Sequence, residues 1–219
     1  MTRCIILSDV HGQPHLVENV LVHAGYQKGQ DRLIFSGDLL DIGPDPLECY
    51  TLLKESSAEL LWGNHDLAIV LRKPIHPQSE YDIPVYEALI SDKANWKVAA
   101  YHDNVLITHA GLSEYFYQNT FELDLTSADQ ICAELNKIPL IDMWYNESPL
   151  WYRPSDMFLP KSNLVQVAGH TPPGYFKRTF RDFYLTDPYC SVGFGKNRYR
   201  YAIIEDNHVK VVDSNDKMF

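Results

Sequence analysis

Short apolar runs recur along the chain, and each is followed by a polar side chain. Five of them predict buried strands, because a short apolar run between turn residues is typical of a strand covered on both faces. These runs span residues 4–8, 32–36, 59–62, 105–108 and 164–168. An Asp, Asn or His follows each run directly or after one glycine. Ligand sites of open α/β sheets lie at the carboxyl ends of the strands, so the pattern predicts one site assembled there.

Helices are predicted in several of the intervals between these strands. Residues 15–24 carry apolar side chains on one helical face, and Gly25 follows where such a helix would end. Asp45 suits the N-cap of a second helix and Pro46 suits its first turn. Residues 126–135 predict a third helix.

The last part of the chain predicts further strands. Residues 182–186, 201–205 and 209–212 are expected to form a second sheet that closes with a hairpin at Asp206 and Asn207. No linker and no internal repeat is visible, so we expect one domain over residues 1–219. The predicted fold class is α/β (α+β): a four-layer sandwich of two mixed β-sheets flanked by helices.

The composition is that of an ordinary globular protein. Of the 219 residues, 45% are hydrophobic and 22% are charged, and no apolar run is long enough to span a membrane. The first motif follows the N-terminus so closely that no signal peptide is expected, and the four cysteines form no CxxC pair. We therefore expect reduced thiols, a cytoplasmic location and no membrane partner.

The net charge of −10 disfavours a nucleic-acid partner, because affinity for a polyanion depends on cationic side chains. Bound divalent ions would reverse the local field in a carboxylate-lined cleft, so the charge lowers the odds of a nuclease without excluding one.

The polar residues at the strand ends form a set that suits divalent metal ions. Carboxylate and imidazole ligands together favour Mn²⁺, Fe²⁺ or Zn²⁺. Asp9 and His11 lie two positions apart, so in an extended segment both would point to the same side and bind one ion. Asp38 has two carboxylate oxygens and can bridge two ions. Neutral ligands for the second ion are Asn64, His109 and His170. Two such ions would share a bridging hydroxide that attacks phosphorus.

Three further residues complete the predicted chemistry. His65 follows Asn64 and is the candidate general acid that protonates the leaving group. Asp41 is expected to accept a hydrogen bond from its ring and keep it cationic. Arg153 is the candidate phosphate clamp, since a guanidinium binds two phosphate oxygens at once.

Five motifs in order resemble those of calcineurin-like metallophosphoesterases. They are SDVHG at 8–12, GDLLDIGPD at 37–45, GNHD at 63–66, THAG at 108–111 and GHT at 169–171. Within that family the chain resembles the phosphoprotein phosphatase branch, which also contains the symmetrical diadenosine tetraphosphate hydrolases. The resemblance implies the same six metal ligands, with His65 as the acid, Asp41 as its partner and Arg153 as a phosphate-binding residue. It also implies two divalent ions, with manganese the usual activator in vitro and iron or zinc equally suited.

Two positions depart from the pattern of that branch. The branch reads Asp-Arg-Gly where this chain has Asp41, Ile42 and Gly43, so half of the expected phosphate clamp is missing. The candidates to replace this arginine are Arg72, Arg178, Arg198 and Arg200. The segment 191–193 is more similar to the wider superfamily than to protein phosphatases. Both departures bear on the substrate rather than on the fold or the metals.

Several functions remain open at this stage. The leading one is hydrolysis of phosphate monoesters on phosphoproteins, at serine, threonine or tyrosine. A dinucleoside polyphosphate hydrolase is the closest alternative, since an adenine would suit the aromatic-rich insertion expected as a cap around 112–152. A nuclease or cyclic phosphodiesterase is disfavoured by the acidic charge. A catalytically dead binding module would fit a broken ligand set, and this set is complete.

Overall fold

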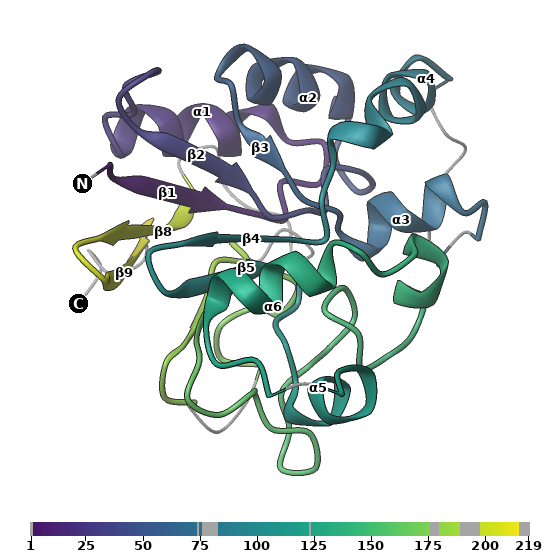
Figure 1. Ribbon diagram of the computed structural model, residues 1–219. Helices are drawn as coiled ribbons and strands as arrows, with labels where there is room; N and C mark the ends of the chain where they lie inside the picture. The colour runs from purple at the N-terminus through teal and green to yellow at the C-terminus, as the bar shows by residue number, and fades with distance from the viewer. Residues whose placement is uncertain are drawn as a thin grey trace.

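Two mixed β-sheets form the centre of the molecule in a computed structural model that describes residues 2–73, 75, 83–122, 124–175, 180–188 and 198–214. The first sheet has the strand order β3-β2-β1-β8-β9 and the second has the order β4-β5-β6-β7. Helices lie on the outer side of each sheet (Figure 1). The predicted two-sheet sandwich with flanking helices is confirmed.

The first sheet combines a parallel and an antiparallel half. Its strands are β1 (Cys4–Leu7), β2 (Arg32–Phe35), β3 (Glu59–Leu60), β8 (Arg200–Glu205) and β9 (His208–Asp213). β1 pairs in parallel with β2, and β2 with β3. β8 joins the free edge of β1 in antiparallel register, with Cys4 opposite Ile204, and β9 follows as a hairpin. The three parallel strands therefore end at one edge of the sheet.

The second sheet is built on the strands that follow. These are β4 (Ala99–His102), β5 (Val105–Thr108), β6 (Val165–Ala168) and β7 (Phe183–Leu185). β5, β6 and β7 are parallel neighbours, and β4 pairs with β5 in antiparallel register. The carboxyl ends of these three strands also share an edge.

Alternating side chains of the strands fill two different layers. Ile6 and Ile34 of the first sheet belong to a buried cluster with Ile107 and Val167 of the second, which is the interface between the sheets. Ile5, the neighbour of Ile6, belongs instead to the larger cluster that contains the helices. Successive strand residues point to opposite faces, so each central strand is covered on both sides, as the continuous apolar runs predict.

The helices lie where the apolar runs leave intervals. They are α1 (Pro14–His23), α2 (Pro46–Glu55), α3 (Asn64–Val70), α4 (Ile83–Asp92), α5 (Glu114–Thr120) and α6 (Ala128–Leu135), with short 3₁₀ turns at η1 (Lys93–Asn95) and η2 (Leu140–Met143). Figure 1 shows α1 and α2 outside the first sheet and α6 outside the second. The predicted start of α2 is confirmed, because the Asp45 side chain accepts a hydrogen bond from the backbone N–H of Glu48 at 3.0 Å.

The prediction for the last strands is wrong in one respect. They do not form a sheet of their own: β8 and β9 extend the first sheet beside β1, and β7 extends the second beside β6. The reason is that strand pairing is decided by which free edge the returning chain reaches, and this choice leaves no local pattern in the sequence. The predicted hairpin is correct, with Asp206 and Asn207 both at positive φ between β8 and β9. The segment 191–193 lies outside the described residues.

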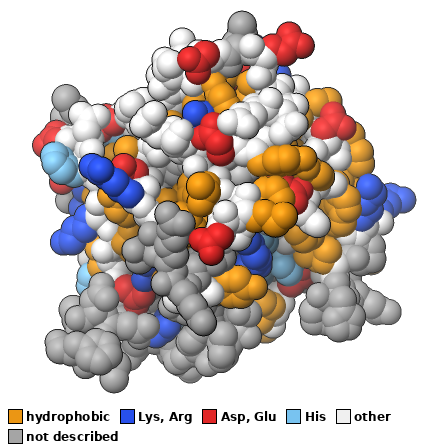
Figure 2. All heavy atoms as spheres, turned by 90° about the horizontal axis from the view of Figure 1, so that it is seen from below, with side chains coloured by type: hydrophobic (Ala, Val, Ile, Leu, Met, Phe, Trp, Pro, Cys, Tyr) orange, Lys and Arg blue, Asp and Glu red, His pale blue; other side chains and the backbone are white. Residues whose placement is uncertain are grey.

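The described cysteines lie in the interior of the fold. Cys4, Cys49 and Cys132 are buried free thiols. Among the described residues, no helix is long and apolar enough to cross a membrane. One face of the molecule, shown in Figure 2, exposes hydrophobic side chains in several patches with acidic side chains between them.

Candidate dinuclear metal centre

The loops that follow the strands of both sheets meet at one place. The backbone N–H of Asp9 donates to the carbonyl of Gly37 at 2.9 Å, which joins the loops after β1 and β2. The N–H of Gly169 donates to the carbonyl of His109 at 2.7 Å, which joins the loops after β5 and β6. The sandwich thus brings the carboxyl ends of both parallel sets together, and with them every predicted ligand.

The predicted ligands leave the strands through a left-handed backbone. The φ angles of Asp9, His11, Asp38 and His170 are 52°, 43°, 61° and 61°. The sequence-based assumption of an extended segment for Asp9 and His11 is therefore wrong. The chain turns sharply after each strand, and these strained turns redirect the side chains into the shared space.

Two glycines allow the loops to approach this closely. A Cβ on Gly63 would lie 2.2 Å from the backbone nitrogen of Asp38, and one on Gly169 would lie 2.1 Å from a carboxylate oxygen of Asp9. Any side chain at either position would displace a predicted ligand. This explains in physical terms why glycine precedes Asn64 and His170 in their motifs.

Asp38 lies at the centre of the arrangement. Its Oδ2 is 3.6 Å from His11 Nε2 and 3.3 Å from His109 Nε2. The candidate ligand atoms form two groups, each within 4.8 Å: His11, Asp38 and His65 in one, and Asp38, His109 and His170 in the other. Because Asp38 belongs to both, it has the position of a bridging ligand between two ions.

The histidine rings are oriented as metal ligands. His11 and His109 each direct Nδ1 at a backbone carbonyl, of Leu40 at 2.6 Å and of Ser36 at 2.8 Å. A ring that donates from Nδ1 presents the lone pair of Nε2, which is the usual arrangement around a metal. The Nε2 of His170 is buried and has no hydrogen-bond partner among the described residues. An orphaned imidazole nitrogen beside a carboxylate fits a metal ligand better than a packed side chain.

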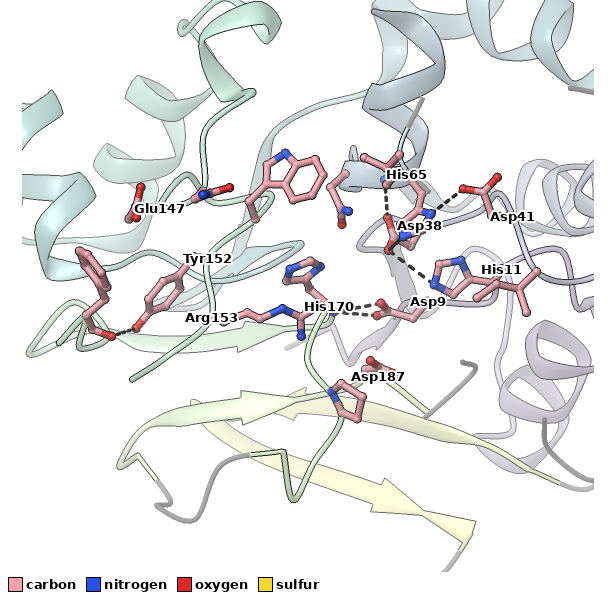
Figure 3. Close-up of a pocket in the computed structure, with 17 residues that line it drawn as sticks. Asp9, His11, Asp38, Asp41, His65, Glu147, Tyr152, Arg153, His170 and Asp187 are labelled. Atoms are coloured by element: carbon pink, nitrogen blue, oxygen red, sulfur yellow. Dashed lines mark hydrogen bonds and ion pairs between the residues drawn. The ribbon is translucent and has the colours of Figure 1, made fainter. Parts of the chain in front are cut away.

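The two remaining predicted ligands lie beside these. Asn64 Oδ1 is 3.0 Å from His109 Nε2. Both Asp9 oxygens are 3.0 Å from the backbone nitrogen of His170, which donates to the carboxylate. Figure 3 shows Asp9, His11, Asp38 and His170 directed toward the same space. The structure therefore brings all six predicted ligands together.

The electrostatics of the centre follow from buried charge. Burial acts to raise the pKa of Asp38, but His109 and His65 outweigh it and hold the pKa well below its usual range. Burial acts to lower the pKa of His109, and the charge of Asp38 instead raises it to about 9. Burial, together with the charges of His109 and Arg153, holds the pKa of His170 well below its usual range.

His65 and Asp41 form a close pair at the edge of the centre. His65 Nδ1 is 2.5 Å from Asp41 Oδ2, and its Nε2 is 3.9 Å from Asp38 Oδ2. Burial acts to lower the pKa of His65, but the charge of Asp38 and the hydrogen bond to Asp41 raise it to about 9. The His65 ring therefore turns Nε2 toward Asp38, while Asp41 holds its Nδ1.

Arg153 reaches the same cleft from the opposite side (Figure 3). Its Nη1 donates to the Thr171 hydroxyl at 3.3 Å, and its guanidinium lies 5.2 Å from the centroid of the Tyr175 ring. Of the other arginines considered as phosphate ligands, Arg72 contacts Tyr86 and Arg200 binds Asp213. Neither lines the cleft, and Arg178 lies outside the described residues.

Sequence reasoning missed the role of Asp66. Its buried carboxylate accepts hydrogen bonds from the backbone N–H groups of Asp38, Leu39, Leu40 and Gly63 at 2.8–3.3 Å. Burial and the charge of Asp38 raise its pKa, while these donors act in the opposite direction. Asp66 therefore fixes the loop that carries Asp38. The sequence indicated this role only through the position of Asp66, two residues after Asn64 on the first turn of α3.

Asp187 was also missed. It is 6% exposed and lines the cleft. The pKa of Asp9 is raised chiefly by burial, and the nearby charge of Asp187 is the second cause. The preceding Thr186 is held by its hydroxyl contact with Ser8 at 2.9 Å. Residues 183–187 repeat the pattern of an apolar run followed by a polar side chain, which is the signal that would have found it.

The cleft over the centre has a volume of about 940 Å³. Besides the polar residues already named, its walls carry apolar and aromatic side chains: Ile42, Ile75, Trp151, Tyr152, Phe158 and Pro172. Of the residues 112–152, which were expected to form a cap, Asn146, Glu147, Trp151 and Tyr152 reach the cleft. Other aromatic rings of this segment pack on neighbouring rings: Tyr117 on Phe121, Trp144 on Trp151 and Tyr115 on Phe158.

Fold and site together define a metal-dependent phosphoesterase. The family model of the calcineurin-like phosphoesterases matches residues 2–212, and the chain belongs to this family. Members are hydrolases that act on phosphoester bonds with a dinuclear metal centre, and this chain carries the histidine and aspartate groups suited to it.

Among curated proteins the chain is similar to symmetrical bis(5'-nucleosyl)-tetraphosphatases. It is 28% identical to that of Vibrio parahaemolyticus over 67% of this chain and 59% of the relative. It is 26% identical to that of Haemophilus influenzae over 73% of this chain and 62% of the relative. The chain thus matches less than two thirds of the length of these relatives.

Solved structures share the fold. A cold-active protein-tyrosine phosphatase of a psychrophilic Shewanella has a TM-score of 0.68 at 17% identity, over 97% of this chain and 80% of that one. A putative diadenosine tetraphosphatase has a TM-score of 0.60 at 22% identity, over 97% of this chain and 93% of that one. At such identities the likeness concerns the fold alone.

Proposed function

We propose that the protein hydrolyses phosphate monoesters at a two-metal centre. The proposed metal ligands are Asp9, His11, Asp38, Asn64, His109 and His170. The observation that carries the proposal is the position of Asp38, whose Oδ2 lies within 3.6 Å of imidazole nitrogens from both ligand groups. Divalent ions held there would polarise the phosphate and lower the pKa of an attacking water. Manganese is the expected activator in vitro, with iron or zinc as the alternatives.

His65 is the proposed general acid. Its Nδ1 is held by Asp41, so Nε2 is the nitrogen available to the substrate, and it faces the carboxylate at the centre. Delivering a proton from Nε2 to the leaving-group oxygen leaves a neutral imidazole that Asp41 still orients. Arg153 is proposed to bind a phosphate oxygen, with Thr171 and Tyr175 holding its guanidinium in place.

This acid favours a phosphoprotein as the substrate. Cleavage of a phosphoserine or phosphothreonine ester releases a strongly basic alkoxide, which needs a proton in the transition state. A dedicated histidine–aspartate pair supplies that proton. We therefore propose a protein phosphatase acting on serine or threonine, and on tyrosine if its ring fits the cleft.

A symmetrical dinucleoside polyphosphate hydrolase is the second candidate. It is supported by the names of the curated relatives and by the aromatic walls on which an adenine would stack. Its leaving group is a nucleoside diphosphate, which is far less basic than an alkoxide and depends less on an acid. The two candidates therefore differ in what His65 contributes.

The wider setting is proposed on the same basis. We propose one domain over residues 1–219, with 112–152 as the insertion that shapes the substrate, and a cytoplasmic location in which the thiols stay reduced. The expected partner is a phosphorylated protein or a nucleotide. We expect no binding to nucleic acid or to a membrane.

The test is hydrolysis by metal-stripped protein with and without Mn²⁺. The substrates are a phosphoserine peptide, a phosphotyrosine peptide, diadenosine tetraphosphate and a bis-aryl phosphate. A manganese-dependent rate that is highest on a peptide supports the first candidate, and one that is far higher on the tetraphosphate supports the second. Activity on the bis-aryl phosphate above that on monoesters would favour a phosphodiesterase. No activity with two ions bound would instead favour a binding module.

A variant tests the proposed role of His65 as the general acid. For the phosphoserine peptide, His65→Ala should lower kcat by about 10²–10⁴-fold, the contribution of a positioned acid. The same variant should lose much less with an aryl phosphate, whose leaving group is weakly basic. His208→Ala, which removes an exposed histidine remote in sequence from every motif, is the matched control. Equal losses on both substrates would contradict the proposed role of His65.

A further inference from the structure

Ile42 occupies an unusual conformation at the mouth of the cleft. It is 60% exposed, lines the cleft and has a φ of 70°. A β-branched residue rarely adopts this left-handed region, because its side chain clashes with its own backbone. A strained and exposed isoleucine beside a catalytic pair therefore requires an explanation.

The surrounding backbone holds Ile42 in this position. The N–H of Gly43 donates to the carbonyl of His11 at 2.8 Å, and the N–H of Asp45 donates to the carbonyl of Gly12 at 2.9 Å. A Cβ on Gly43 would lie 2.4 Å from the same His11 carbonyl, so the two loops touch backbone to backbone. The turn at Ile42 therefore packs tightly against the loop that carries His11. This packing fixes the position of the Ile42 side chain.

Ile42 lies on the leaving-group side of the site. It follows Asp41 directly, and Asp41 holds His65, whose proposed role is to protonate the leaving group. Figure 3 shows Asp41 and His65 on one side of Asp38, and Arg153 on the other side beside Asp9 and His170. A phosphate bound between these sides directs its leaving group toward His65 and toward the residue that follows Asp41.

The charges on that side disfavour an anionic leaving group. Among the described residues that line the cleft, Arg153 is the single lysine or arginine. A polyphosphate leaving group at Ile42 would meet an apolar side chain and the pair of Asp41 and His65. Because the Asp41 carboxylate offsets the charge of the His65 ring, no net positive charge is left on this side to stabilise a polyanion. An uncharged apolar group would instead cover Ile42 and release water from it.

We propose that Ile42 forms the apolar wall of the leaving-group subsite and selects phosphate esters with an uncharged, apolar leaving group over polyphosphates. A phosphotyrosyl side chain, or a phosphoresidue followed by a hydrophobic one, has this chemistry. This inference rests on the proposed phosphoester hydrolysis and narrows its substrate class.

The first test compares selectivity within active enzyme. For wild type, Ile42→Val, Ile42→Ala and Ile42→Arg, kcat/KM is measured on phenyl phosphate and on diadenosine tetraphosphate. The ratio should fall about 10-fold in Ile42→Ala, which removes three carbons from a partly exposed wall, and further in Ile42→Arg. Ile42→Val, which removes one carbon and stays β-branched and apolar, should give a ratio between those of wild type and Ile42→Ala. Val22→Ala, at a helix position that is 81% exposed, controls for loss of an exposed apolar side chain.

Binding provides a readout that does not depend on turnover. Calorimetry with Mn²⁺-loaded protein would compare benzylphosphonate with methylenediphosphonate, whose second group is anionic. The preference for benzylphosphonate should weaken in Ile42→Ala and reverse in Ile42→Arg, with unchanged metal content. An unchanged kcat/KM ratio and an unchanged binding preference in both variants would overturn the inference while leaving the proposed function intact. A wild type that binds benzylphosphonate but cleaves no ester would overturn the proposed function alone.

Discussion

The buried carboxylate of Asp66 provides the sharpest test of how the centre is held. Each of its oxygens accepts two backbone N–H groups: Oδ2 those of Asp38 and Gly63, and Oδ1 those of Leu39 and Leu40. In Asp66→Asn one oxygen becomes an amide NH₂. Whichever way the amide turns, two buried N–H groups then face a donor and lose their acceptor.

The expected cost follows from these lost bonds. A buried donor without an acceptor costs about 1–3 kcal/mol, so two of them cost about 2–6 kcal/mol. Removing the negative charge also relieves its repulsion with Asp38, which favours the lower part of this range. For a protein of this size, 1 kcal/mol corresponds to about 2–4 °C in Tm, so the variant should melt about 4–24 °C below wild type.

The assay is thermal unfolding of metal-free protein, followed by circular dichroism. Asp45→Asn is the matched control, because Asp45 accepts one N–H as the N-cap of α2 and asparagine caps a helix equally well. Its Tm should stay within about 2 °C of wild type. If Asp66→Asn also melts within that interval, the four hydrogen bonds do not support the loop in the way argued above.

Three further outcomes are expected. Asp187→Asn should weaken the binding of one divalent ion by about 10–100-fold in calorimetry, because it removes a carboxylate next to Asp9. If the variant binds both ions with the wild-type affinities, this expectation is contradicted. Adding Mn²⁺ at about 100 times its dissociation constant should stabilise the protein by about 2.7 kcal/mol, and a chelator should reverse the resulting shift in Tm. A Tm that changes with neither Mn²⁺ nor the chelator would argue against an ordered metal site. Burial raises the pKa of Cys4 to about 12 and that of Cys132 to about 11, and it also raises the pKa of Cys49. All three thiols therefore stay protonated at about pH 8, so a Cys190→Ser protein should not react with a disulfide reagent until it is denatured. Rapid reaction of the native protein would contradict this.

The candidate metal ligands could be recognised in the sequence because each depends on short-range information. A ligand such as His109 follows directly on a buried strand, and the strand is visible as an apolar run in the sequence. Parallel strands in one sheet end at the same edge, so the ligands of each sheet had to meet. The pairing of His65 with Asp41 was also predicted, and the structure places the two side chains in direct contact.

Other features were decided only by the tertiary structure, because they depend on contacts between distant segments. The last strands join the edges of β1 and β6, which no local pattern distinguishes from a sheet of their own. Asp66 accepts hydrogen bonds from the N–H groups of Asp38, Leu39 and Leu40, which lie 26–28 positions away in the sequence. Asp187 reaches Asp9 only because β7 pairs with β6. Ile42 lines the cleft because Gly43 packs on the loop of His11. The candidate ligands and the His65–Asp41 pair are encoded locally, since each lies within a few residues of a strand that the sequence predicts. The packing of the two sheets decided which groups hold and surround them.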